Sequence, residues 1–216
     1  SRRTALKFSE RTFEARDMEK TLFGTDGIRG VAGEPPLDEK TVAVVGSCLG
    51  RQLKKADPQA RVIIGQDTRE SGPWIAATLA QALRETGVAV DSPGVIPTPG
   101  LAYLVVHGKY SAGVMVSASH NPYADNGIKV FGRDGFKFPD ADELALEAEI
   151  QAALPQAHRP AEAPELSADK KLLQPYAEHL LALAKLAKNL PGKRAVIDCA
   201  NGAATALARE VFSAIP

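Results

Sequence analysis

Short apolar stretches rich in β-branched residues alternate with amphipathic helical patterns along most of the chain, and this alternation restricts the fold more than any other feature. The run RVIIG at 61–65 indicates a buried strand, because it is short, continuous and bounded by polar residues. Further strands are predicted at 88–90, 113–119 and 128–132, and helices at 38–55, 71–86, 101–107 and 142–153. Strands that alternate with helices are typical of α/β proteins, so we predict an α/β fold.

Two of the predicted helices carry clear start and stop signals. Asp38 can cap the first, and Lys54 and Lys55 suit its C-terminal end. Ser71 is expected to cap the second, which has Pro73 in its first turn and ends just before Gly87.

Composition narrows the possible partners. The 216 residues include 26 basic and 26 acidic ones, so the formal net charge is zero. This balance disfavours a nucleic-acid or membrane-surface protein, and no apolar run approaches the length of a membrane span. Cys48 and Cys199 stand apart from any CxxC or Cys/His cluster, which favours free thiols over a disulfide. We therefore expect a cytoplasmic protein that binds neither nucleic acid nor membrane.

The chain divides into unequal parts. Residues 1–17 are charged without an apolar core, which favours a flexible extension over a secretory signal. A first domain is predicted at 18–155, followed by a proline-containing linker at 156–167. In 168–216 we expect a helix over 172–183, a strand and turn in RAVIDCANGAA (194–204), and the start of a helix. These elements cannot cover a sheet, so we interpret 168–216 as an incomplete second domain and the chain as a piece of a longer protein.

The segment SASHNP at 117–122 is the first candidate site. It lies at the end of a predicted buried strand, where α/β proteins place their ligands. Pro122 restricts both its own backbone and that of Asn121, so a rigid loop would present Ser119 and His120 together. A serine hydroxyl needs a base or charged partner to act as a nucleophile. An ordinary polar turn at a strand end is the alternative.

Two arginines and a lysine are further candidates. In GTDGIRG (24–30) the glycines can admit an anion and Arg29 can bind phosphate, although the segment taken alone slightly favours a simple turn between short strands. Arg69 follows the strand at 61–65 and is either a phosphate contact or a surface partner of Asp67 or Glu70. Lys129 is either solvated or a proton-transfer group with a lowered pKa.

Other polar residues receive a structural interpretation. Asp140, Asp142 and Glu143 resemble a metal cluster, but they lie at a predicted helix start, where acids cap N–H groups. The isolated His107, His158 and His179 show no ligand pattern and receive no role.

Four ordered segments, LFGTDGIRG (22–30), QDTRESG (66–72), PTPG (97–100) and SASHNPYADNGIKVFG (117–132), resemble the α-D-phosphohexomutase superfamily. DCANGA (198–203) resembles the opening of that family's second domain. LFGTDGIRG is most similar to the phosphoglucosamine mutase branch of bacteria. The resemblance implies a three-layer α/β/α first domain with a mixed sheet, followed by the beginning of a second, similar domain.

The resemblance also implies a reaction. Glucosamine 6-phosphate and glucosamine 1-phosphate would interconvert through a phosphoserine enzyme and a bisphosphate intermediate, for amino-sugar nucleotide and cell-wall precursor synthesis. Ser119 would carry the phosphoryl group, with Lys129 as general acid or base. The implied catalytic residues are Ser119, His120, Lys129 and Arg29, and the implied phosphate or substrate contacts are Thr25, Arg29, Arg69 and Asn121.

The family further implies one Mg²⁺ per active site, bound by the phosphate on Ser119 and by aspartates of a DGDxDR-type loop that this sequence does not contain. We accordingly expect the chain alone to be inactive, and the protein to be a monomer or homodimer. A phosphomannomutase or phosphoglucomutase is one alternative, and a non-catalytic phosphosugar-binding fragment is another.

Overall fold

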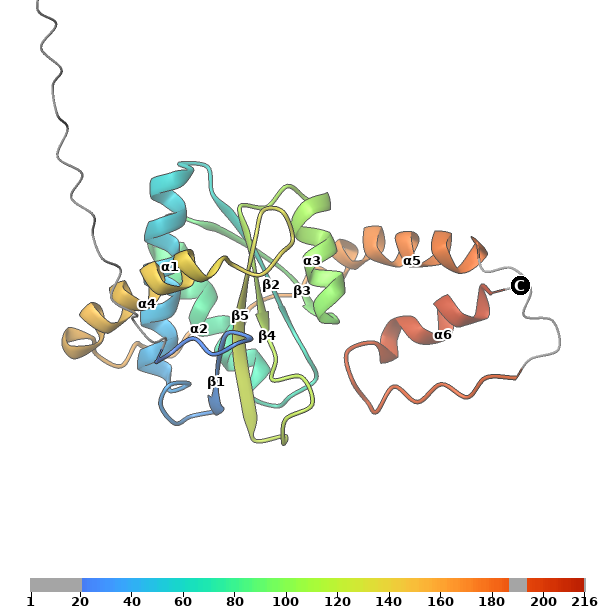
Figure 1. Cartoon of the computed structure of the whole chain (residues 1–216), viewed down its shortest axis with the longest axis horizontal. Helices are drawn as coiled ribbons and strands as arrows, with labels where there is room; N and C mark the ends of the chain where they lie inside the picture. Colours follow the sequence, from blue (N-terminus) through green and yellow to red (C-terminus); the bar gives the residue numbers. More distant parts are fainter. Residues whose placement is uncertain (1–20, 187–193, 216) are drawn as a thin grey trace, which may run out of the picture.

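A mixed five-stranded sheet forms the centre of the computed structural model, which describes residues 21–186 and 194–215 (Figure 1). The predicted extension at 1–17 lies outside the described residues. The strands follow the order β1 (Ile28–Val31), β5 (Asp125–Gly132), β4 (Ala112–Val116), β2 (Arg61–Gln66) and β3 (Ala89–Val95). β2 is parallel to β3 and β4, whereas β5 is antiparallel to β4 and β1. The predicted α/β fold with a mixed sheet is confirmed.

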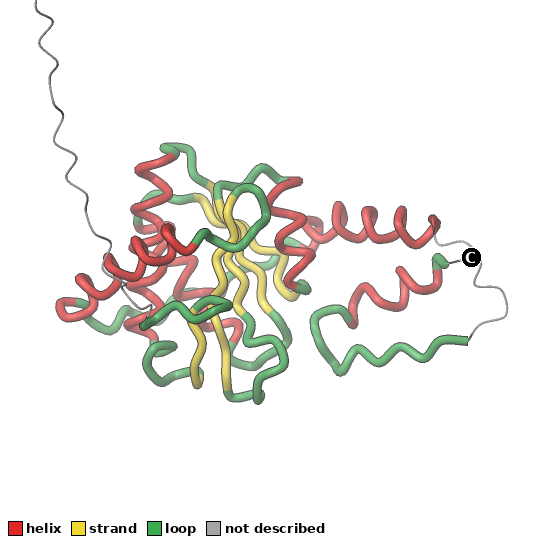
Figure 2. Tube along the Cα trace, in the orientation of Figure 1, coloured by secondary structure: helices red, strands yellow, loops and turns green. Residues whose placement is uncertain are grey.

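Helices cover both faces of the sheet, which gives the predicted three layers (Figures 1 and 2). One face carries α1 (Glu39–Ala56), α2 (Gly72–Glu85) and α4 (Asp140–Ala153). The other carries α3 (Thr98–His107), with α5 (Gln174–Leu186) beside it. Ile64 packs into the core on the α1 and α2 side, and its neighbour Ile63 into the core on the α3 side. The side chains of β2 alternate between the two faces of the sheet, and helices cover each face, so β2 is buried on both faces.

The two helix starts differ from each other. Asp38 caps α1 as predicted, and its Oδ1 accepts a hydrogen bond from the Thr41 N–H at 3.1 Å. Ser71 precedes α2 but makes no side-chain cap, so that prediction is wrong. Its hydroxyl instead accepts a hydrogen bond from Asn126 Nδ2 at 2.8 Å, which ties α2 to the start of β5. Gly87 follows α2 with a left-handed φ of +84°, in agreement with its predicted stop.

Two acidic residues on α4 bind groups outside the helix. Asp140 and Asp142 lie in its first turn, as predicted, but Glu143 is fully buried and pairs with Lys137 Nζ at 3.1 Å. Glu147 accepts hydrogen bonds from the backbone N–H groups of Thr21 and Phe23 at 2.7 and 3.0 Å. This carboxylate therefore anchors the chain just before β1.

The C-terminal part is less regular. Two 3₁₀ turns, η1 (Leu154–Gln156) and η2 (Lys170–Leu173), flank an irregular segment before α5. The strand predicted in RAVIDCANGAA does not form: 194–199 is irregular and leads to α6 (Thr205–Ser213). Val196 is 97% exposed there, because no neighbouring strand in the described residues pairs with this segment. Among the described residues, no helix combines the length and apolar character needed to cross a membrane.

Candidate active site

The candidate site lies where two parallel strands end side by side. β4 leads into residues 117–126, here called the serine loop, whose last two residues begin β5, and β2 leads into Asp67 and Arg69. The Asp67 N–H donates to the Val116 carbonyl at 3.0 Å, and the Ser117 N–H donates to the Gly127 carbonyl at 2.9 Å. A methyl group on Gly127 would lie 2.8 Å from the Ser117 oxygen, so this close approach requires glycine. These bonds place the serine loop at the carboxyl edge of the sheet, where α/β proteins bind ligands.

Ser119 is exposed and adopts a left-handed backbone conformation with φ +58°. Its N–H donates to Ser117 Oγ at 3.0 Å. Its own hydroxyl lies 3.5 Å from His120 Nδ1, at the outer limit of a hydrogen bond. The predicted pair of Ser119 and His120 is thus presented together to solvent, on a backbone that is strained for a residue with a side chain.

Asn121 connects the serine loop to β1. Its Oδ1 accepts a hydrogen bond from Arg29 Nη1 at 3.3 Å, and its Nδ2 donates to Asp125 Oδ2 at 2.9 Å. Arg29 Nη2 also pairs with Asp26 Oδ2 at 2.9 Å. Thr25 is exposed in the turn between Gly24 and Gly27 that precedes β1. The segments GTDGIRG (24–30) and SASHNP (117–122), both singled out from the sequence, therefore meet through Arg29 and Asn121.

Arg29 and Lys129 lie on one face of the sheet. Arg29 is opposite Gly127 in the β1–β5 pair, and Lys129 follows Gly127 by two residues, so the two side chains share a face. Burial lowers the pKa of Lys129, and the positive charge of Arg29 lowers it further, while Asp26 and Asp67 oppose these effects in part. Arg29 Nε is buried without a hydrogen-bond partner among the described residues. The face thus offers an unused arginine donor and a lysine that loses its proton more easily than usual.

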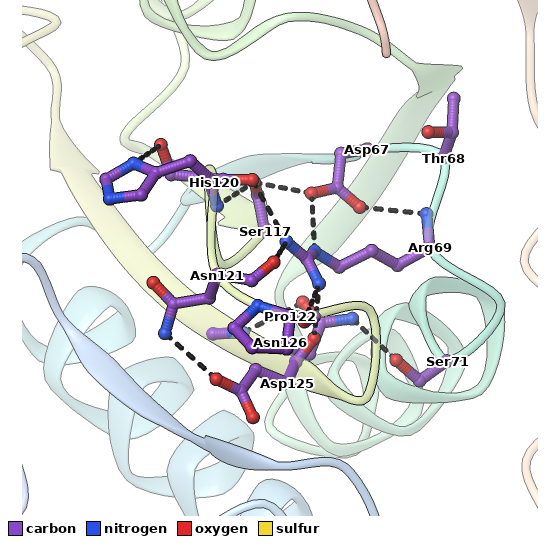
Figure 3. Close-up of polar contacts among 12 residues, drawn as sticks. Asp67, Thr68, Arg69, Ser71, Ser117, His120, Asn121, Pro122, Asp125 and Asn126 are labelled. Carbon is purple, nitrogen blue, oxygen red and sulfur yellow. Dashed lines mark hydrogen bonds and ion pairs between the residues drawn. The ribbon is translucent and has the colours of Figure 1, made fainter. Parts of the chain in front are cut away.

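Arg69 is not the surface partner that its sequence context allowed. The Arg69 and Asp67 side chains are only 10% and 15% exposed, and Arg69 Nε donates to Asp67 Oδ2 at 3.2 Å. The four remaining N–H groups point at backbone carbonyls of the serine loop (Figure 3). A phosphate contact would require one of these bonds to break.

Three supporting residues, Asp67, Ser117 and Asn126, were not among the predicted site residues. Ser117 donates its hydroxyl to Asp67 Oδ2 at 2.6 Å, which links the two strand ends (Figure 3). Asn126 is fully buried and joins the serine loop to Ser71. Asp67 and Ser117 could have been suspected because polar residues at the carboxyl ends of buried strands often serve a site. No such signal distinguished Asn126 in the sequence.

A cleft of about 720 Å³ opens beside Ser119 and His120. Asp67, Arg69 and Ser117 line it from the first part of the chain, and 200–203 contributes Ala200, Gly202 and Ala203. Thr68 Oγ donates to the Asn201 carbonyl at 3.0 Å across this opening. The site is therefore open, polar and bordered by both parts of the chain. No group of three or more His, Cys, Asp or Glu side chains in 21–186 and 194–215 could hold a metal ion.

The fold and the site together define an α/β/α domain that presents an exposed serine on a rigid loop at the carboxyl edge of its sheet. Residues 20–157 match the family model described as phosphoglucomutase/phosphomannomutase, alpha/beta/alpha domain I. The chain belongs to the phosphoglucomutase/phosphomannomutase family, which is part of the phosphohexomutase superfamily.

Relatives and solved structures agree with this assignment. Phosphoglucosamine mutase of Solibacter usitatus is 48% identical over 200 residues, which cover 92% of this chain and 44% of that protein. Phosphoglucosamine mutase of Koribacter versatilis is 49% identical over 197 residues, which cover 89% and 42%. The crystal structure of a phosphoglucomutase/phosphomannomutase family protein from Burkholderia thailandensis superposes with a TM-score of 0.70 at 26% identity, covering 90% of this chain and 42% of that one. The chain thus spans less than half the length of these relatives.

Proposed function

We propose that this chain is the phosphoserine-bearing part of a phosphoglucosamine mutase. The observation that carries the proposal is the position of Ser119, which is exposed on a rigid loop. Arg29 is hydrogen-bonded to that loop, and Lys129 lies on the same face of the sheet as Arg29. The names of the two relatives at 48% and 49% identity favour glucosamine phosphate over mannose or glucose phosphate as the substrate. We place the protein in the cytoplasm and 168–216 at the start of a second domain.

The proposed reaction is a phosphoryl transfer in two directions. A hydroxyl of the sugar monophosphate attacks the phosphorus on Ser119; the bond from phosphorus to Ser119 Oγ breaks, and a sugar bisphosphate forms. The bisphosphate then reorients so that its other phosphoryl group faces Ser119. Ser119 Oγ attacks that phosphoryl group, and the isomeric monophosphate leaves. Such transfers depend on alignment and neutralised charge more than on covalent help from the protein.

The residues of this chain supply part of that chemistry. Lys129 accepts the proton of the attacking hydroxyl and returns it to the leaving oxygen; its lowered pKa favours the neutral, accepting form. Arg29 and Asn121 border the phosphoryl group, and His120 lies beside it. Thr25 lies in the same β1-side segment as Arg29 and completes the proposed substrate contacts.

Magnesium fits this chain only in part. The phosphate on Ser119 would be one ligand, while the described residues offer no complete acidic site. The other ligands would come from aspartates outside this chain. Mg²⁺ bound between them and the phosphate on Ser119 would neutralise charge on the transferred group. We therefore expect no turnover from the 216 residues alone, and substantial turnover by them would contradict this part of the proposal.

The proposal is tested by intact-protein mass spectrometry with site mapping on the complete protein that contains this chain. We expect one phosphate on Ser119, and loss of both the phosphate and mutase activity in Ser119→Ala. Ser213→Ala, at the end of α6, is the control and should retain both. A phosphate found only on another residue would refute the central assignment. A coupled assay with glucosamine, mannose and glucose phosphates should rank glucosamine phosphate first.

A second experiment tests Lys129. Lys129→Ala should lower kcat by roughly 10²–10⁴-fold, the usual contribution of a general acid or base. Lys109→Ala, in the turn after α3, serves as the matched control. The wild-type kcat should rise with pH through the lowered pKa of Lys129, because only the neutral amine accepts a proton. Unchanged kinetics in Lys129→Ala would show that Lys129 takes no part in proton transfer.

A further inference from the structure

Arg69 uses every N–H group of its guanidinium on the protein itself. Nε donates to Asp67 Oδ2, at 3.2 Å. Nη1 donates to the carbonyls of Pro122 and Asp125, and Nη2 to those of Ser119 and Asn121, the last two at 2.9 and 2.8 Å. A guanidinium has five N–H groups, so no donor is left for a ligand. The serine loop thus wraps around one buried cation (Figure 3).

Asp67 and Ser117 extend this arrangement to the other side of Ser119. Asp67 Oδ1 accepts a hydrogen bond from the backbone N–H of Arg69 at 3.0 Å, and its Oδ2 accepts one from the Ser117 hydroxyl at 2.6 Å. Ser117 Oγ in turn accepts from the Ser119 N–H at 3.0 Å. Both peptide groups of Ser119 are therefore fixed, the N–H through Ser117 and the carbonyl through Arg69.

This double attachment accounts for the backbone of Ser119. A left-handed φ of +58° costs energy for a residue with a Cβ and persists only where the surroundings enforce it. The four carbonyls held by Arg69 also have their negative ends turned towards the guanidinium. These carbonyl oxygens therefore do not face the side of the loop where a phosphoserine would add about two negative charges, and they do not repel the phosphate there.

We propose that Arg69, oriented by Asp67, is a positioning residue that holds Ser119 in the geometry for phosphoryl transfer, and that it does not bind the substrate phosphate. The inference rests on the proposed mutase function and replaces the phosphate contact first expected for Arg69. It requires the fork of an arginine, since a lysine offers three donors from a single atom and cannot span four carbonyls and a carboxylate.

The test compares Arg69→Lys and Arg69→Gln in the complete protein. Both should lower kcat roughly a hundredfold, because a misplacement of about 1 Å has that effect, while KM stays within about threefold. Arg61→Gln is the matched control: Arg61 begins β2, the strand that leads towards Arg69, and pairs with Asp91 at 2.7 Å, remote from the serine loop. Its kcat should be unchanged. A wild-type kcat in Arg69→Lys, or a change confined to KM, would overturn the inference in favour of a phosphate contact.

A readout independent of turnover separates this inference from the proposed function. In the unphosphorylated 216-residue chain, amide hydrogen exchange at 118–126 should accelerate at least about tenfold in both Arg69 variants and stay unchanged in Arg61→Gln. Equal exchange in all variants would overturn the inference whatever the activity. A wild-type protein without phosphate on Ser119 and without turnover would instead refute the proposed function, and the exchange comparison would still decide whether Arg69 holds the loop.

Ser117→Ala is the second variant if the Arg69 variants do not fold. It removes only the hydroxyl between Asp67 and the Ser119 N–H, so we expect a kcat loss of about tenfold with exchange accelerated at 118–120. Ser111→Ala, at the opposite end of β4, loses a comparable bond to Asp57 at 3.1 Å and should keep full kcat. Equal behaviour of the two serine variants would contradict the positioning role.

Discussion

Residues 61–72 and 194–205 start from similar sequences and reach different structures. Each begins with an arginine and a short β-branched run, passes through a polar turn and leads into a helix. In the first, Arg61–Gln66 pairs with strands on both sides and α2 packs on the sheet. In the second, 194–199 forms no strand, and no residue of α6 is fully buried.

The difference lies in the neighbours of each segment. A strand is stable only where other strands satisfy its N–H and C=O groups, whereas a helix satisfies them internally. This explains why α6 forms while the run before it does not. The polar turns of the two segments nevertheless touch, through the hydrogen bond from Thr68 to Asn201. The second segment thus has the local sequence for a strand and lacks its partners in the described residues.

The largest expected effect separates the two apolar runs. Ile63→Ala should lower the free energy of unfolding by about 2–5 kcal/mol, because Ile63 is fully buried and its loss leaves a cavity. Val196→Ala should change it by less than about 0.5 kcal/mol, because Val196 is 97% exposed. Urea unfolding of both variants measures the two values. Equal destabilisation would show that 194–199 is packed in solution, and would break the comparison.

The sheet and its helices were predictable because each strand pattern there finds its pairing strands among the described residues. The continuous run at 61–65 gave β2, and Asp38 gave the start of α1. The strand expected at 194–199 failed because a local pattern cannot show whether a neighbouring strand is present. Ser71 likewise has the residue type of a cap, but the long-range contact with Asn126 takes its hydroxyl.

The sequence singled out candidate residues but not their connections. The structure brings Ser119 beside His120 and Arg29 beside Asn121, and the roles of these residues stay predictions. The bonds of Arg69 depend on how 119–125 folds around the end of β2, and nothing in the spacing of QDTRESG reveals this. The left-handed backbone of Ser119 is equally hidden, since serine has no preference for it.

A medium effect concerns the carboxylates of α4 and α6. Burial alone would raise the pKa of Glu147, but hydrogen bonds from Phe23, Thr21 and Leu22 lower it below its ordinary value. Because the folded-state pKa lies below the unfolded one, Glu147 stabilises the fold above the ordinary glutamate range, and this stabilisation is lost as pH falls through the lowered pKa. Unfolding free energies of Glu147→Gln should therefore lie below those of wild type at neutral pH and approach them in acid. Glu210→Gln, on the exposed side of α6, should follow the wild-type pH profile; if it behaves like Glu147→Gln, the stabilisation does not come from the anchored carboxylate.

The smallest effect concerns the single side-chain bond between the two turns. Thr68→Ala removes the hydroxyl that donates a hydrogen bond to the Asn201 carbonyl, and this exposed bond should contribute at most about 1 kcal/mol. The global unfolding free energy should hardly change, whereas amides at 199–203 should exchange faster, because Ala200 and Asn201 have left-handed φ values of +47° and +52° that need support. Thr68→Ser retains the hydroxyl and should restore the wild-type exchange. If Thr68→Ala leaves exchange at 199–203 unchanged, the local bonds of that turn, such as the Ala200 N–H to Asp198 Oδ1 at 2.8 Å, are sufficient to hold it, and the two segments are independent despite their contact.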